Sequence, residues 1–147
     1  MRAPLRYQFS EFDCGTISLL NAVSFLFNIK EIPAELVKAI NTNTLDCFNE
    51  QGSCGTTRYA IEKLSTWIND YSATTCFNIK CESYYGDAVT IDLIKSKLQD
   101  DNTVIFIRSW LSGYGHYVIV TKIDNDFAYL FDPYYFGEER FDKRPTI

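Results

Sequence analysis

The spacing of the apolar residues changes near residue 74, and this change constrains the fold more than any other feature of the sequence. Before it, apolar residues recur at helical intervals, and after it they mostly alternate with polar ones. The predicted helices cover residues 14–29, 33–40, about 57–68 and 90–98. The predicted strands cover residues 74–82, 103–108, 115–123 and 127–132. Helices and antiparallel strands that are segregated along the chain are typical of the α+β class.

A length of 147 residues suits one domain, and we expect a single domain over residues 1–147. The polar region 41–56 is interpreted as a loop inserted in that domain rather than as a domain boundary. Aromatic residues make up 16% of the sequence, which favours a filled core over disorder.

The charge of the chain disfavours binding to nucleic acid, and its hydropathy disfavours a membrane-spanning helix. The net charge is −5, which disfavours nucleic acid because phosphate contacts need a basic footprint. A membrane-spanning helix needs about 18 consecutive apolar residues, and the best candidate is interrupted by Ser18, Asn21 and Ser24. We therefore expect no transmembrane segment and a cytoplasmic protein. The sequence does not indicate the oligomeric state.

The five cysteines are Cys14, Cys47, Cys54, Cys76 and Cys81, an odd number that favours free thiols in a reducing compartment over a disulfide framework. A zinc site built from the last four is the alternative. The spacings within the pairs 47/54 and 76/81 are wider than in usual zinc knuckles. Cys76 and Cys81 would also lie on opposite faces of the strand predicted there. We therefore predict isolated thiols and no metal.

His116 is the only histidine, so any chemistry that needs an imidazole must use it. It opens one of the last two predicted strands, and Asp132 closes the other. Only residues 124–126 join these strands, which predicts an antiparallel hairpin. A turn there makes the two residues cross-strand neighbours, with Cβ atoms about 4.5–5.5 Å apart if they are directly opposed. Asp132 would then accept the Nδ1–H bond of His116 and fix its tautomer.

Both residues also have ordinary structural interpretations. A single histidine at the start of a strand is often a satisfied core or surface residue. An aspartate that is followed by proline is a common way to open a turn.

Cys14 is the thiol best placed to act as a nucleophile beside such a base. Asp13 is a natural N-cap, which puts Cys14 in the first turn of a helix. There the free N–H groups and the helix dipole favour the thiolate. Glu11 and Asp13 oppose this effect, so His116 would have to pair with the thiolate. The alternative is that Cys14 is a small buried hydrophobic residue.

Gln8 lies in the irregular segment before this helix, where its side-chain NH₂ could face the oxyanion of an attacked carbonyl, beside the Cys14 N–H. A solvated loop amide is the alternative. Gly113 and Gly115 would let a substrate backbone approach, or would serve a turn with positive φ. The candidates for an aromatic groove, for which sheet packing is the commoner role, are Tyr84, Tyr85, Trp110, Tyr134 and Tyr135.

Three motifs, taken in order, resemble the peptidase C39 and C39-like domains of the papain-like superfamily. They are QFSEFDCG at 8–15 before an apolar helix, GHYVIV at 115–120 and FDP at 131–133. The resemblance covers essentially the whole chain. It implies a papain-like fold, with the nucleophile at a helix start in an N-terminal helical half and an antiparallel sheet in the C-terminal half.

The resemblance also implies a role for each site residue. Gln8 corresponds to the oxyanion-hole glutamine, Cys14 to the nucleophile, His116 to the general base and acid, and Asp132 to the residue that orients the histidine. No metal or organic cofactor is required.

The best-known C39 members cleave double-glycine leader peptides, usually as the N-terminal part of an ABC exporter. This chain departs from them in its longer stretch between Cys14 and His116, and it shows no nucleotide-binding motif. We therefore expect a thiol protease that cleaves a peptide bond in an unidentified peptide or protein substrate. Two alternatives remain open: a non-catalytic peptide-binding module, and a papain-like deamidase or acyltransferase.

Overall fold

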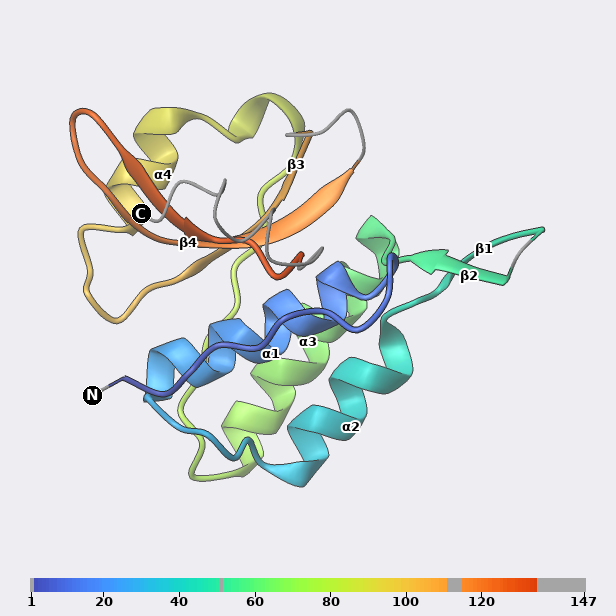
Figure 1. The fold of residues 1–147 in the computed structure, drawn as a ribbon. Helices are drawn as coiled ribbons and strands as arrows, with labels where there is room; N and C mark the ends of the chain where they lie inside the picture. The colour runs from blue at the N-terminus through green and yellow to red at the C-terminus, as the bar shows by residue number, and fades with distance from the viewer. Residues whose placement is uncertain (1, 51, 111–114, 135–147) are drawn as a thin grey trace.

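A computed structural model describes residues 2–50, 52–110 and 115–134 of the chain (Figure 1), without the side chains of residues 49 and 52–54. The helices are α1 (Cys14–Phe27), α2 (Ala34–Asn43), α3 (Arg58–Thr74) and α4 (Ile91–Lys97), with a short 3₁₀ turn at Gly86–Ala88. The strands are β1 (Cys47–Asn49), β2 (Gly52–Gly55), β3 (Ile105–Ser109), β4 (His116–Ile123) and β5 (Ala128–Phe131). The predicted α+β class is confirmed.

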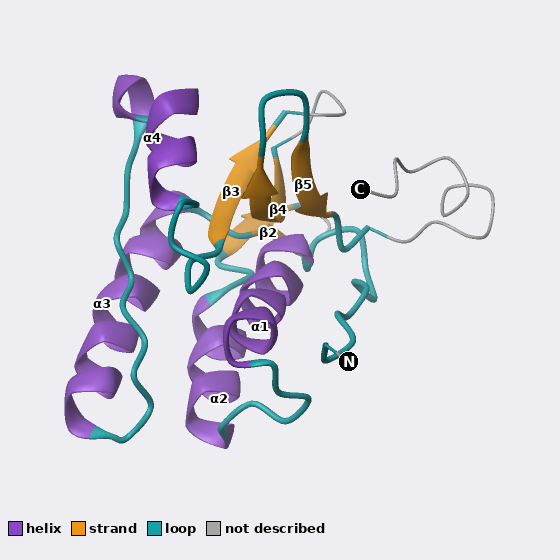
Figure 2. Ribbon diagram, turned by 90° about the vertical axis from the view of Figure 1, so that its left-hand side faces the viewer, coloured by secondary structure: helices purple, strands orange, loops and turns teal. Residues whose placement is uncertain are grey.

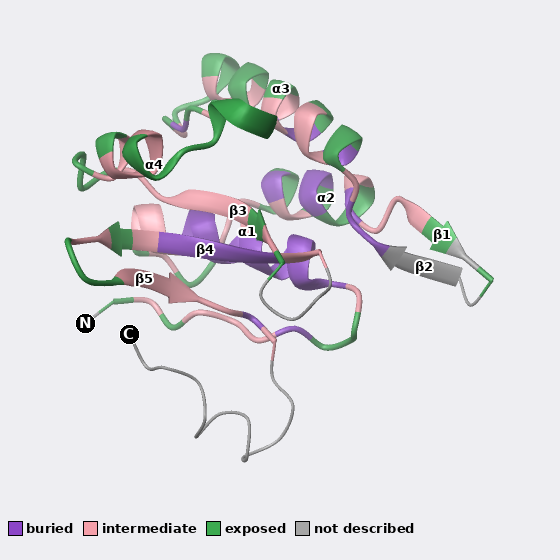
Figure 3. Cartoon of the chain, turned by 90° about the horizontal axis from the view of Figure 1, so that it is seen from above, coloured by how far each residue is buried: buried purple, intermediate pink, exposed green. Residues whose placement is uncertain are grey.

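The β3-β4-β5 sheet is antiparallel with β4 in the centre, and α1 packs against β4 on one side and against α2 on the other (Figure 2). Figure 3 shows the inner part of β4 as buried. The core comes from three helices and one extended segment: Ile17, Leu20, Val23, Leu36, Ala39, Ile40, Leu64, Ile68 and Ile79. α1 therefore lies at the centre of the described structure.

The polar residues that interrupt the apolar run of α1 attach it to its neighbours. Ser18 donates to the carbonyl of Tyr117 on β4 at 2.9 Å. Asn21 accepts from the N–H of Arg6 at 2.7 Å and donates to its carbonyl at 2.8 Å. Ser24 accepts from the Arg6 guanidinium at 2.7 Å. These buried polar groups are therefore satisfied. Asn21 and Ser24 hold the segment before α1 along the helix, and Ser18 links the helix to β4.

The predicted strand over 74–82 is wrong, because α3 continues to Thr74 and the following segment pairs with no strand among the described residues. The alternation in this segment is real, since Ile79 is in the core and Phe77 and Cys81 pack against it. Its partner, however, is a helix. Asn69 of α3 accepts the N–H of Cys81 at 2.8 Å and donates to its carbonyl at 3.1 Å.

Residues 41–56, expected to be an inserted loop, contain the antiparallel pair β1–β2, which projects from the body of the molecule in Figure 1. The other expected elements are confirmed with shifts of a few residues at their ends. Among the described residues, no helix is both long and apolar enough to cross a membrane.

Candidate active site

Cys14 is the first residue of α1, as predicted, and its side chain is 7% exposed. Asp13 precedes it, and the backbone carbonyl of Asp13 accepts the first hydrogen bond of the helix, from the N–H of Ile17 at 2.9 Å. Its carboxylate does not cap the helix, contrary to expectation. It accepts instead from the backbone N–H groups of Phe9 and Ser10, each at 2.9 Å. Asp13 therefore shapes the loop that leads into the cysteine.

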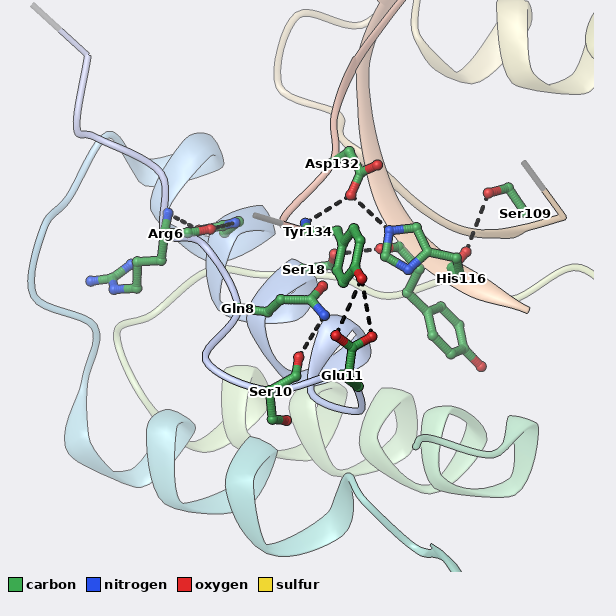
Figure 4. Close-up of polar contacts among 11 residues, drawn as sticks. Arg6, Gln8, Ser10, Glu11, Ser18, Ser109, His116, Asp132 and Tyr134 are labelled. Carbon is green, nitrogen blue, oxygen red and sulfur yellow. Dashed lines mark hydrogen bonds and ion pairs between the residues drawn. The ribbon is translucent and has the colours of Figure 1, made fainter. Parts of the chain in front are cut away.

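His116 and Asp132 meet as predicted: Nε2 of the imidazole lies 2.7 Å from Oδ1 of the carboxylate (Figure 4). From the sequence, Nδ1 was predicted to form this bond, and that prediction is wrong. The same Oδ1 accepts the backbone N–H of Tyr134 at 2.8 Å. This turn through Pro133 holds the carboxylate against the ring. Both interpretations of Asp132 therefore hold at once, as turn opener and as histidine partner.

His116 and Asp132 are cross-strand neighbours, as predicted, but they are not directly opposed. An irregularity between Val120 and Lys122 shifts the β4–β5 pairing, so Ile119 faces Phe131. Continued along β4, this register puts Asp132 opposite Val118 and diagonal to His116. A diagonal pair on one face of a sheet still lies within reach of long side chains. On its other side His116 pairs with Ser109 of β3.

His116 also interacts with Cys14. Burial of the ring lowers the pKa of His116, but hydrogen bonds and charge interactions with Asp132 and Cys14 outweigh it and raise the pKa to about 9. The imidazole is therefore protonated at neutral pH. Because Nε2 bonds Asp132, Nδ1 is the ring nitrogen left for the thiol. A protonated imidazole that interacts with a thiol favours the thiolate form of that thiol.

Gln8 is buried, which excludes the interpretation as a solvated loop amide. Its backbone N–H donates to the carbonyl of Pro133 at 2.8 Å, so the segment before α1 runs beside the end of β5. Its side-chain Nε2 donates to the carbonyl of Ser10 at 2.6 Å, as Figure 4 shows. Its Oε1 is buried and has no hydrogen-bond partner among the described residues. The role of Gln8 as oxyanion donor stays a prediction.

Sequence reasoning missed the link between Glu11 and Tyr134. The Tyr134 hydroxyl shares its one proton between the two carboxylate oxygens of Glu11, at 3.1 and 3.2 Å. The Tyr134 ring stands edge-on to the His116 ring, with 6.1 Å between the centroids. Tyr134 was considered only as a groove residue. Its position two residues after Asp132 is the signal that could have identified it.

A cleft of about 190 Å³ opens beside Cys14. It has three walls: Glu11 and Phe12 from the loop, Cys47 and residues 55–58 from the hairpin and the start of α3, and Arg108, Gly115 and Tyr117 from the sheet. The region expected to be surplus loop therefore forms one wall of the candidate site.

Gly115, which lines this cleft, and Gly15, which packs against the lining residue Thr56, allow close packing. A Cβ on Gly15 would lie 2.8 Å from Cβ of Thr56 and would also collide with its hydroxyl. A Cβ on Gly115 would lie 2.7 Å from Cζ of Arg108. The space at Gly115 is thus filled by an arginine rather than left for a substrate backbone. Gly113 lies outside the described residues.

The other cysteines and the remaining tyrosines of the suggested aromatic groove do not form a site among the described residues. Cys14, Cys76 and Cys81 are free thiols, and the described residues include no group of three His, Cys, Asp or Glu side chains placed to hold a metal. The side chain of Cys54 lies outside the described part, as does Tyr135. The ammonium group of Lys97 lies over the ring of Tyr84, and the guanidinium group of Arg58 lies over the ring of Tyr85.

Comparison with known proteins gave no match: no family model, no curated protein and no solved structure is significantly similar to this chain.

Proposed function

We propose that the protein is a cysteine hydrolase of the papain-like type, which cleaves a peptide bond through Cys14, His116 and Asp132. The observation that carries the proposal is the placement of His116, whose ring contacts Asp132 at 2.7 Å and interacts with Cys14. The location of Cys14 at the start of α1 and on the wall of a cleft supports it.

In the first half of the reaction the Cys14 thiolate attacks the substrate carbonyl, forming the C–S bond and an oxyanion. The backbone N–H of Cys14 and the amide of Gln8 donate to this oxyanion. Only one of the two side-chain N–H groups of Gln8 is needed for Ser10, which leaves the other for this role. The His116 imidazolium protonates the departing amine as the C–N bond breaks.

In the second half His116, now neutral, accepts a proton from water, which attacks the thioester and releases the acid product and the thiolate. Asp132 acts throughout by holding the ring through Nε2, so that Nδ1 serves the sulfur and the leaving group. No step needs a metal or an organic cofactor.

The proposal is tested by incubating the purified protein with a complex mixture of peptides and identifying the changed peptides by mass spectrometry. We expect new termini that are absent with Cys14→Ala. A mass gain of about 1 Da at glutamine or asparagine, or a ligated product, would instead support the deamidase or the acyltransferase. If the wild type and Cys14→Ala leave the same peptides unchanged, hydrolysis is contradicted, and the non-catalytic binding module is favoured.

A further inference from the structure

The cleft beside Cys14 contains two arginines that come from different walls. Arg58 is the first residue of α3, and Arg108 lies on β3. The catalytic proposal uses neither of them. Their role therefore needs a separate explanation.

The guanidinium of Arg108 is positioned by its surroundings. It fills the space over Gly115 that a side chain would occupy. Its Cζ lies 5.4 Å from the ring centroid of Trp110 and 5.9 Å from that of Tyr117. Within the described part of the chain, no carboxylate forms an ion pair with it. Its N–H donors are therefore available to a ligand while its orientation is restricted.

Arg58 is held in a comparable way. Its Cζ lies 3.7 Å from the ring centroid of Tyr85, and its Nε donates to Glu62 at 2.8 Å. Arg58 and Glu62 are well exposed, at 62% and 43%, so this pair is weak. The terminal nitrogens of Arg58 are not used by Glu62.

Apart from Cys14, the charged residues that line the cleft are two arginines and one carboxylate, in a chain whose net charge is −5. The only acidic lining residue is Glu11, which already accepts a bifurcated hydrogen bond from the Tyr134 hydroxyl. Oriented guanidinium groups are suited to planar anions, which they bind through two parallel hydrogen bonds.

We propose that this cleft binds a carboxylate of the substrate, so that the protein prefers peptides with an acidic side chain or a free C-terminus near the attacked bond. This inference rests on the proposed function, because it makes the arginines specificity-determining residues for the reaction at Cys14.

The test uses three alkylating probes that share an iodoacetyl group: N-iodoacetyl-glutamate α-amide, N-iodoacetyl-glutamine α-amide and N-iodoacetyl-glutamine with a free α-carboxylate. In each, the Cys14 sulfur bonds the CH₂ carbon and iodide leaves. The first probe presents a side-chain carboxylate, the second presents none, and the third presents a terminal one. Rates of labelling at Cys14 are measured by peptide mapping at low salt.

We expect one of the charged probes to react about tenfold faster than the neutral probe, a preference typical of one charge-assisted contact. Which probe reacts faster identifies the source of the carboxylate. The preference should fall to near unity in Arg58→Gln/Arg108→Gln and survive in part in Arg108→Lys. The ratio to the neutral probe cancels any change in thiolate reactivity. Added salt should weaken the preference.

The matched control is Arg2→Gln/Lys95→Gln, which also removes two positive charges, but from residues that line a different pocket. This variant should keep the wild-type ratio. Equal rates for all three probes in the wild type would overturn the inference, and so would a preference that the double variant retains. Neither result would contradict the proposed function. No labelling of Cys14 by the neutral probe would overturn the proposed function itself.

Discussion

The imidazole of His116 reaches Asp132 across a diagonal of the β4–β5 ladder, with Nε2 2.7 Å from Oδ1, although the strand register does not place the two residues opposite each other. Asp132 follows the last residue of β5, and the N–H of Tyr134 holds its carboxylate at 2.8 Å. The position of the carboxylate thus depends on a turn as well as on the strands.

Asp132→Asn should lower turnover by about 10²-fold or more, because a neutral amide stabilises the imidazolium less and no longer fixes the tautomer. The melting temperature should also fall at neutral pH, because the charge that stabilises the imidazolium is lost, although an asparagine oxygen still accepts the N–H of Tyr134. Steady-state kinetics and thermal unfolding measure the two effects. A large drop in melting temperature with unchanged turnover would mean that Asp132 only opens a turn.

The raised pKa of His116 predicts how stability depends on pH. The pKa of His116 is about 9 in the folded protein, against the ordinary histidine value of 6.5, so the folded state binds the proton more tightly. The resulting stabilisation is fully present below about pH 6.5 and is lost as the pH rises through about 9.

Denaturant unfolding of the wild type and of His116→Gln at several pH values should show this loss as a shrinking difference in the free energy of unfolding. Turnover should fall over the same upper range, because the imidazolium that protonates the leaving group disappears. A difference between the two proteins that stays constant from pH 6 to about 9.5 would exclude a raised pKa.

Gln8→Ala should reduce turnover by about 10²- to 10³-fold if the amide donates to the oxyanion. Stability should also fall, because the buried amide bonds the carbonyl of Ser10. The KM should change less than kcat, since the contact forms mainly in the transition state. An unchanged kcat would remove Gln8 from the mechanism.

Gly15→Ala should disturb the cleft. The added Cβ would collide with the side chain of Thr56 and lie 3.2 Å from the ring of Tyr117. The cost of such overpacking, about 1–3 kcal/mol, exceeds the gain of roughly 1 kcal/mol from replacing a helical glycine. Labelling at Cys14 should slow as well.

The control for Gly15→Ala is Gly86→Ala, which has open space around it and strains only its own backbone, at φ +58°. It should cost stability without changing the reactivity of Cys14. A Gly15→Ala protein that is more stable than the wild type, with unchanged labelling of Cys14, would contradict the packing seen here.

The sequence predicted the helices and the last hairpin because their periodicity reflects burial against one dominant partner. It failed at 74–82, where alternation arises from packing on α3 rather than from a sheet. Local pattern cannot distinguish these cases, because both bury every second side chain.

The prediction that Cys14, His116 and Asp132 converge came from a helix start and the numbering of a hairpin, and both signals are local. The prediction that Nδ1 bonds Asp132 was wrong, because the choice of nitrogen depends on the rotation of the ring and on the register shift near Val120. The roles of Gly115 and Arg108 were missed because they come from the packing of side chains on neighbouring strands. Sequence spacing carries no information about such packing.

The central claim is that His116 activates Cys14, and the pattern of alkylation by limiting iodoacetamide at mildly acidic pH tests it most directly. An ordinary thiol is almost fully protonated there, and burial raises the pKa of Cys81 to about 11. Intact mass and peptide mapping should show one label, at Cys14, ahead of the exposed Cys76. His116→Ala should abolish this selectivity. Labelling of Cys76 before Cys14 in the wild type, or the same selectivity in His116→Ala, would contradict the account.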